Sequence, residues 1–439
     1  MNMQAAPQSD QNDVRAEIAA LKDQKGLLSR QVGEAKKAGE PCDGLISELQ
    51  QVSSRLKACQ KSLKKSLNAL DNADSPGPVL PDIPEAVLSK TGVATSVVDA
   101  LAVPDVVDAA RKYVQAHAAA SIWHLPEVLE FISAHYGHSC QYFCARDKAG
   151  KVVGVLPVVQ LRSRLFGNFM VSVPYFNYGG VLADNPDIAR TLLEAADAWR
   201  SDKEASHVEL RHHADQGLQL PSRTGKVTFW LPLPDNTNDL WRSFQPKVRA
   251  QVKRGRQAVA EPVIGGAELL DDFYRVFARN MRDLGTPVYD KAFFRELLNT
   301  LGPKARLVTV KIGNKPVGCA LITLFRGRME IPWASTLREF NHTGLNMAMY
   351  WQILECAIKQ GCQVFDFGRC SREAGTYRFK QQWGATPIPL HWDYCLAEGQ
   401  QLPELNPDNP KFRLMIEAWK RLPLWMSRLI GPGIVKNLP

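Results

Sequence analysis

The sequence predicts an α/β (α+β) protein in which one supersecondary motif occurs twice, behind an N-terminal antiparallel helical hairpin. Three observations lead to this fold class: a heptad pattern near the N-terminus, a proline-rich segment after it, and a repeated order of hairpin, strand, helix and strand. The expected boundaries are a helical coiled-coil hairpin at 1–72, a linker at 73–100, repeats at 101–235 and 236–398, and a basic amphipathic tail at 399–439.

Residues 1–72 are expected to form two antiparallel helices. Apolar side chains recur at alternating spacings of four and three from Val14 to Ala35, and again from Leu45 to Leu63. This spacing is typical of a coiled-coil seam. The Gly- and Pro-containing cluster at 39–44 separates the two runs and predicts the turn.

The segment that follows the hairpin is expected to be a linker. It contains Pro76, Pro78, Pro81 and Pro84 within nine residues. Neither a helix interior nor a central strand tolerates prolines at this density.

The remaining chain contains an internal duplication. In each copy two strand-like runs surround a turn, a third strand ends in a proline before an aromatic residue, and an amphipathic helix leads into a short strand. The corresponding segments are 141–145 and 306–311, 152–160 and 317–325, 171–174 and 329–332, 187–200 and 346–360, and 207–211 and 364–368. The same order twice indicates two related domains.

An antiparallel hairpin that leads into a βαβ crossover is the layout of an N-acetyltransferase (GNAT)-type domain. In that layout two strands separate and open a cleft for the acyl donor or the acceptor. The sequence therefore predicts tandem GNAT-type domains.

The composition indicates which binding partners and which cellular compartment to expect. The net charge of +9 favours an anionic partner, such as RNA, a nucleotide-linked sugar or a membrane surface, although an ordinary basic enzyme has the same charge. The nine cysteines show no paired metal-ligand spacing, so we expect reduced thiols and no metal site. A polar N-terminus and the lack of an apolar run of ~18 residues predict a cytoplasmic protein.

The C-terminal tail is amphipathic and basic. Trp419, Lys420, Arg421, Trp425 and Arg428 lie among leucine and isoleucine residues. Such a stretch either contacts the inner face of the membrane peripherally or packs as helices onto the body of the protein.

Several segments resemble the FemAB family of aminoacyl and acyl transferases. The likeness spans about residues 110–395. It rests on residues 241–254, 273–284, 333–335, 366–368 and 375–384, and on the run Pro174-Tyr-Phe-Asn-Tyr-Gly-Gly180. Together these motifs are similar to those of FemAB-like proteins associated with exosortase (PEP-CTERM) and exopolysaccharide loci. The resemblance implies transfer of an acyl group, without a tightly bound cofactor, to an amine of a cell-envelope or exopolysaccharide precursor such as a nucleotide- or lipid-linked sugar.

The resemblance also implies two catalytic candidates. Lys380 matches the family's Phe-Lys motif, where a lysine would stabilise the developing oxyanion; otherwise it is a solvated surface lysine. Asp366 alternates with Phe365 and Phe367 and so points away from their apolar face. It either accepts a proton or orients the amine, or it is a structural carboxylate that pairs with Arg369 or caps a turn. No Ser/His/Asp or Cys/His signature is present, so direct transfer is expected.

The substrate-binding candidates form three groups. Lys247 and Arg249 begin a basic run suited to phosphates, with a solvated helix as the alternative. An aromatic, amide-rich loop suits a sugar-like ligand, with a core-and-turn role as the alternative. The loop residues are Tyr175, Asn177 and Tyr178, and the further candidates are Arg211, Trp333, Ser335, Arg369 and Tyr377.

The N-terminal hairpin resembles the tRNA-binding arm of seryl-tRNA synthetases, on Lys36-Lys37-Ala38-Gly39-Glu40 before the turn and on the Leu-rich return helix. The resemblance implies tRNA contact through Lys57, Lys61 and Lys64. A stalk for dimerisation through the coiled coil and a solvated spacer are the alternatives.

The acyl donor is either aminoacyl-tRNA or acyl-CoA. Acetyl-CoA enzymes of this fold usually carry a glycine-rich pyrophosphate loop at a helix N-terminus, but here the stretch 341–346 holds one glycine, Gly344. With the tRNA-arm likeness, this favours aminoacyl-tRNA. The alternatives are a CoA-dependent N-acetyltransferase for a sugar or small amine, and a non-catalytic tRNA- or membrane-associated adaptor.

Overall fold

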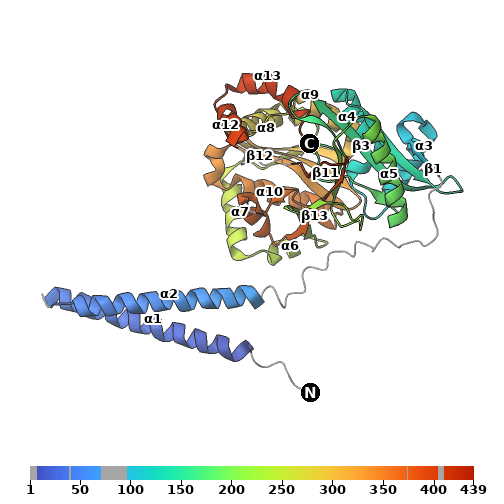
Figure 1. Ribbon diagram of the computed structural model, residues 1–439. Helices are drawn as coiled ribbons and strands as arrows, with labels where there is room; N and C mark the ends of the chain where they lie inside the picture. Colours follow the sequence, from blue (N-terminus) through green and yellow to red (C-terminus); the bar gives the residue numbers. More distant parts are fainter. Residues whose placement is uncertain (1–6, 39–40, 71–95, 373, 404–409) are drawn as a thin grey trace, which may run out of the picture. The chain divides into compact units, whose positions relative to one another are not determined.

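The computed structural model describes residues 7–38, 41–70, 96–372, 374–403 and 410–439. The chain divides into two compact units, Met1–Gly77 and Pro78–Pro439. The first unit is helical and the second is an α/β body with two sheets (Figure 1).

Two helices form the first unit, α1 (Pro7–Ala38) and α2 (Asp43–Leu70). They pack through a small apolar core of Leu21, Leu28, Val32, Val52 and Leu56. The expected helical hairpin is therefore present, whereas a coiled-coil dimer remains a prediction. Lys57, Lys61 and Lys64 fall in α2, but their side chains lie outside the described residues.

The expected linker at 73–100 lies mostly on residues 71–95, which are outside the described ones. Its last residues are not linker. Strand β1 (Ser96–Asp99) pairs antiparallel with β2 (Cys140–Arg146), and the Asp99 side chain accepts hydrogen bonds from the backbone N–H groups of Leu101 and Tyr142. The first sheet therefore begins at Ser96.

The first sheet has seven strands in one path and an eighth strand at its side. The order is β1, β2, β3 (Val152–Ser163), β4 (Gly167–Val171), β6 (His207–His212), β16 (His391–Leu396) and β7 (Ser222–Arg223), with β5 (Leu182–Ala183) beside β3. β4 and β6 run parallel, and the other pairs are antiparallel.

The second sheet repeats this order. Its path is β14 (Cys370–Ser371), β8 (Lys226–Pro232), β13 (Val364–Asp366), β12 (Arg328–Thr336), β11 (Lys315–Phe325), β10 (Ala305–Ile312) and β9 (Val263–Gly265), with β15 (Thr386–Pro389) beside β8. β12 and β13 are its parallel pair, equivalent to β4 and β6. The duplicated α/β fold predicted from the sequence is confirmed.

The two repeats exchange one strand each. β8 precedes the expected boundary at residue 235 but pairs with β13 of the second sheet. β16 belongs to the second repeat in sequence but pairs with β6 of the first sheet. The boundary therefore separates two sequence repeats, whereas each sheet is completed by a strand of the other.

Helices cover the sheets with their apolar residues. In α8, Phe273, Val276 and Phe277 lie at i, i+3 and i+4 and are fully buried. The helices of the body are α3 (Pro104–Ala116), α4 (Pro126–Tyr136), α5 (Pro186–Asp202), α6 (Thr237–Ser243), α7 (Pro246–Ala258), α8 (Leu270–Leu284), α9 (Lys291–Leu301), α10 (Leu345–Lys359), α11 (Gly375–Gln381), α12 (Pro410–Lys420) and α13 (Leu424–Val435). Short 3-10 turns lie at Ala100–Ala102, Ile122–His124, Ala267–Leu269, Gly302–Lys304 and Arg338–Thr343.

The C-terminal tail folds onto the body through one face. Ser427, Gly431 and Val435 recur every four residues and are buried. Trp425 and Leu429 of the same helix are 64% and 71% exposed. Within the described ranges, no helix combines the length and the apolar character that crossing a membrane requires.

Candidate functional site

The parallel pair of the second sheet separates after three residues. Glu330 of β12 and Asp366 of β13 form the last matched position, beyond which β12 continues to Thr336 while the other chain turns. The turn packs closely on β12. A Cβ on Gly368 would lie 2.5 Å from the Ile331 carbonyl oxygen, and its φ of +73° also favours glycine. The side chains at this separation are the candidate site.

Asp366 is fully buried and its oxygens are saturated with donors. Oδ1 accepts from the Thr228 hydroxyl and from the Gly368 N–H at 2.8 Å, while Oδ2 accepts from the Tyr178 hydroxyl and from Trp230 Nε1 at 2.9 Å. The contact with Gly368 caps the turn. This arrangement fits the structural alternative for Asp366 better than a role as proton acceptor.

Glu330 is a buried carboxylate that the sequence reasoning missed. It accepts from Asn177 Nδ2 at 2.6 Å and from Trp123 Nε1 at 2.8 Å. Burial and the neighbouring Asp366 charge raise its pKa above the ordinary range, against the attraction of Arg328. Its signal in the sequence is a charged residue inside an apolar strand.

The predicted ligand loop after β4 connects the two repeats. Asn177 and Tyr178 donate to the buried carboxylates of the second sheet, and the Tyr175 hydroxyl donates to the Lys436 carbonyl at 2.6 Å. Val173 and Tyr175 hold positive φ angles of 54° and 76°, a costly conformation for such residues. The polar atoms of this loop thus serve contacts within the protein, and ligand binding by it remains a prediction.

Lys380 lies on α11 and is 5% exposed, so it is not a solvated surface lysine. Its Nζ donates to the carbonyl oxygens of Gly368 at 2.6 Å and Arg369 at 3.1 Å. An ammonium carries three N–H groups, so one remains for another acceptor. Burial lowers the pKa of Lys380 to about 8.

Arg211 lies on β6 and Arg369 lies in the turn between β13 and β14, and the two side chains meet at one indole. Their guanidinium carbons lie 4.5 Å and 5.0 Å from the centroid of the Trp392 ring. Arg211 also donates from Nε to Glu209 at 2.7 Å. Burial and the neighbouring Arg211 charge lower the pKa of Arg369 to about 10.

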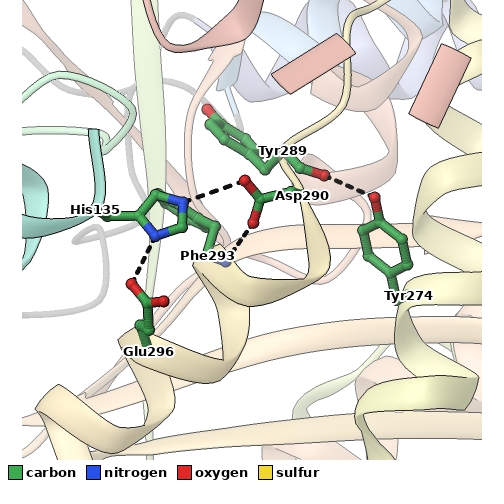
Figure 2. Close-up of polar contacts among 6 residues, drawn as sticks. All are labelled: His135, Tyr274, Tyr289, Asp290, Phe293 and Glu296. Atoms are coloured by element: carbon green, nitrogen blue, oxygen red, sulfur yellow. Dashed lines mark hydrogen bonds and ion pairs between the residues drawn. The ribbon is translucent and has the colours of Figure 1, made fainter. Parts of the chain in front are cut away.

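Tyr289 lies within reach of the charges of these arginines, on the segment before α9, which is held by a partly exposed ion-pair cluster. His135 Nδ1 bonds to Glu296 at 2.6 Å, and Nε2 bonds to Asp290 at 3.3 Å (Figure 2). The Tyr274 hydroxyl donates to the backbone carbonyl of Tyr289 at 3.0 Å, which leaves the Tyr289 phenol free of the other groups drawn (Figure 2). The cluster holds the residue after Tyr289, and Tyr274 holds the Tyr289 backbone itself.

The structure places the remaining candidates of the second repeat as follows. The Trp333 ring packs on the edge of Tyr289, with ring centroids 5.6 Å apart. Ser335 accepts a hydrogen bond from Asn280 Nδ2 at 3.0 Å. Tyr377 is half-buried on α11, the helix that carries Lys380. Trp333 and Tyr377 thus belong to the neighbourhood of the site, whereas the Ser335 hydroxyl has a structural partner.

The basic helix α7 lies against the N-terminus of α10. A Cβ on Gly255 would lie 2.4 Å from the Gly344 carbonyl oxygen, so the two backbones are in direct contact. Val252 is buried in the same face of α7, while Lys247 is exposed and Arg249 is half-buried. The single glycine at the start of α10 therefore serves helix packing.

A cavity of about 360 Å³ lies at the end of β6 in the first repeat, and Arg211 is among its lining residues. Its lining includes His117, His124, His213 and the start of α5. The start of α5 is a poor phosphate site, because Pro186 lacks an N–H and Asn185 caps the helix. Among the described residues, no group of three or more His, Cys, Asp or Glu side chains is placed to hold a metal ion.

Comparisons with known proteins agree with this fold. Residues 242–381 match the family model described as acetyltransferase (GNAT) domain. No curated protein sequence gives a significant match.

Among solved structures, the chain is similar to FemX, with a TM-score of 0.52 and 14% identity over 65% of this chain and 95% of FemX. A tandem GNAT protein from the clavulanic acid biosynthesis pathway has a TM-score of 0.43 and 12% identity, over 71% of this chain and 99% of that one. L-PGS from Bacillus licheniformis has a TM-score of 0.41 and 13% identity, over 70% and 96%. The domain match and the duplicated sheet order indicate an acyltransferase with a tandem GNAT-type fold, and the likeness to FemX is a likeness of fold.

Proposed function

We propose that this protein is a FemAB-like N-acyl or aminoacyl transferase that moves an acyl group to an amine of a cell-envelope or exopolysaccharide precursor. One observation carries the proposal: the Lys380 ammonium is buried where β12 and β13 separate, and it retains one N–H after donating to Gly368 and Arg369. It lies within the segment that matches the acetyltransferase domain.

The proposed chemistry is direct transfer. The acceptor amine attacks the acyl carbon, a C–N bond forms, and the C–O bond of an ester or the C–S bond of a thioester breaks. The proton lost by the amine ends on the leaving oxygen or sulfur. Negative charge develops on the carbonyl oxygen during attack, and a compact cation in a buried site stabilises it most where the charge appears. Lys380 takes this role, and Asp366 holds the turn that positions it.

The acyl donor in this proposal is aminoacyl-tRNA. The exposed cations of α7, which include Lys247, Lys253 and Arg254, are suited to the phosphates of a tRNA end. The start of α10 is packed under Gly255 of the same helix, which leaves less room for a pyrophosphate. The acetyltransferase domain match favours acyl-CoA as the second candidate donor.

The donor is tested with labelled substrates. Purified protein is incubated with an amine-bearing sugar nucleotide acceptor and either charged tRNA or acetyl-CoA, and label in the acceptor is counted. We expect transfer from charged tRNA. Transfer from acetyl-CoA alone would replace the proposal with the CoA-dependent enzyme, and no transfer from either donor with any amine acceptor would count against both.

The hairpin is proposed to bind the donor tRNA through Lys57, Lys61 and Lys64. The compact unit ends at Gly77, so a chain that begins at Pro78 removes the hairpin cleanly. We expect this truncation to weaken the binding of charged tRNA. Unchanged binding would favour the alternative that the hairpin is a dimerisation stalk. Peripheral membrane contact through the exposed Trp425 and Leu429 of α13 is a further proposal, tested by sedimentation with anionic vesicles.

A further inference from the structure

Three buried donor atoms without partners gather at the junction of the two repeats. They are one terminal guanidinium nitrogen of Arg211, one of Arg369, and the indole Nε1 of Trp392. Both guanidinium groups lie over the ring of this same Trp392. A buried donor without an acceptor destabilises the folded protein, so three such donors in one cluster call for an acceptor that the described residues do not supply.

The charges of the same cluster do not balance. Arg211 is paired with Glu209, whose second oxygen accepts from the Tyr394 hydroxyl at 3.0 Å. The described residues provide no carboxylate within ion-pair distance of Arg369. A buried cation is normally paired, so the cluster carries one positive charge in excess.

The geometry suits an anion with several oxygens. Guanidinium groups offer parallel N–H donors that match carboxylate and phosphate oxygens. Tyr289 lies within reach of the charges of both arginines, and its buried phenol, with a pKa raised to about 12, stays protonated as a further donor. The cluster therefore offers donors from two strands of the first sheet and from the turn after β13, together with one spare positive charge.

We propose that Arg211, Arg369 and Trp392 form a recognition site for an oxyanion, a carboxylate or phosphate, carried by the acyl acceptor. Assigning the ligand to the acceptor rests on the proposed function, whereas the oxyanion site itself does not. Lys380 donates to the backbone carbonyl oxygen of Arg369. The proposed oxyanion site therefore lies next to the lysine that is proposed to stabilise the transition state. The site selects acceptors that carry an anionic group near their amine.

An empty site of this kind is destabilising. Arg369→Gln removes the excess charge and the unpartnered guanidinium nitrogen and leaves a shorter amide, so without added anion it should leave the melting temperature unchanged or raise it. A purely structural Arg369 would give a lower melting temperature. The matched control is Arg372→Gln, which removes an exposed arginine three residues away.

The site is tested directly by isothermal titration calorimetry at constant ionic strength, with inorganic phosphate and with acetate as separate probes. We expect saturable binding by the wild-type protein and by Arg372→Gln, and at least tenfold weaker binding by Arg369→Gln and by Trp392→Phe. Tighter binding of phosphate than of acetate indicates a phosphate-bearing acceptor, and the reverse order indicates a carboxylate.

No saturable binding of either probe, or equal binding by Arg369→Gln, would overturn the oxyanion site. The outcome is independent of catalysis. Anion binding in a protein that transfers no acyl group would leave the site in place and count against the proposed function instead.

Discussion

The two repeats share one layout but use their central carboxylates differently. In the first, Glu209 pairs with Arg211 and with Tyr394 of the exchanged strand, so its charge is balanced locally. In the second, Asp366 takes four neutral donors and lies beside a second buried carboxylate, Glu330. A single buried ion pair serves as scaffold, whereas several buried charges close together, here Glu330 and Asp366 with Arg328 and Lys380, are typical of a site that performs chemistry.

The exchanged strands place equivalent residues opposite the two carboxylates. Tyr394 of β16 is the register partner of Glu209, and Trp230 of β8 is the register partner of Asp366. Each aromatic donates to the carboxylate opposite it. Both repeats therefore share a buried carboxylate with an aromatic donor opposite it. They differ in the residues around this pair, chiefly in the buried Lys380 of the second repeat.

Lys380→Met should give the largest change. Loss of the buried ammonium removes the proposed oxyanion stabilisation, so acyl transfer should fall by ~10²–10³-fold. Lys151→Met, which removes an exposed lysine of the first repeat, is the control and should keep the wild-type rate. Initial rates with labelled donor measure both, and circular dichroism checks folding.

Gly368→Ala should give the largest loss of stability. The new Cβ meets the Ile331 carbonyl at a backbone angle that disfavours side chains, and the change should cost about 2 kcal/mol or more of the free energy of unfolding. Gly375→Ala starts from open space in α11 and should be neutral or slightly stabilising. Urea unfolding compares the two; similar losses would mean that the turn is not tightly held.

Tyr394→Phe and Tyr178→Phe compare the carboxylates of the two repeats. Among the described residues, Tyr394 is the one hydrogen-bond donor to Oε2 of Glu209, whereas Oδ2 of Asp366 keeps the Trp230 donor after Tyr178 is changed. We expect losses of about 1.5 kcal/mol for Tyr394→Phe and about 0.5 kcal/mol for Tyr178→Phe in unfolding free energy. The reverse order would contradict the assignment of the first repeat as the balanced scaffold.

The ion-pair cluster of His135 should give the smallest effect, visible as a pH dependence. Burial disfavours the charge of His135, but its hydrogen bonds to Asp290 and Glu296 outweigh burial and raise its pKa above about 6.5. A raised folded pKa means that this stabilisation is complete below pH 6.5 and is lost as pH rises through the folded value.

Urea unfolding of the wild-type protein and of His135→Gln at pH 6 and pH 8 measures the stabilisation that the charged His135 contributes. The stability difference between the two proteins should be larger at pH 6. A difference that is equal at both values would show that His135 is not charged in the folded state.

Local patterns predicted the repeats because they depend on nearest neighbours in the chain. The segments expected at 187–200 and 346–360 are helices α5 and α10 within two residues at each end. The strand exchange was not predictable in this way, since β8 and β16 have ordinary strand patterns and their partners are set by long-range packing. The start of β1 at Ser96 was hidden by the prolines before it.

The candidate site was predicted in part. The sequence indicated Lys380 and Arg369, and the structure brings them to one turn. Glu330 was missed because its importance depends on its register against Asp366, which no local pattern reports. Trp392 was missed for a similar reason: it reaches the arginines only through the exchanged strand.

The central claim is that the protonated Lys380 stabilises the transition state of acyl transfer. Single-turnover rates of labelled acyl transfer, measured from pH 6.5 to 9.5, test it most directly. The burial that lowers the pKa of Lys380 to about 8 predicts that the wild-type rate falls as pH rises through about 8. Lys380→Arg should lack this fall because its guanidinium stays charged. A wild-type rate that keeps rising through pH 8, or an identical fall in Lys380→Arg, would contradict the account.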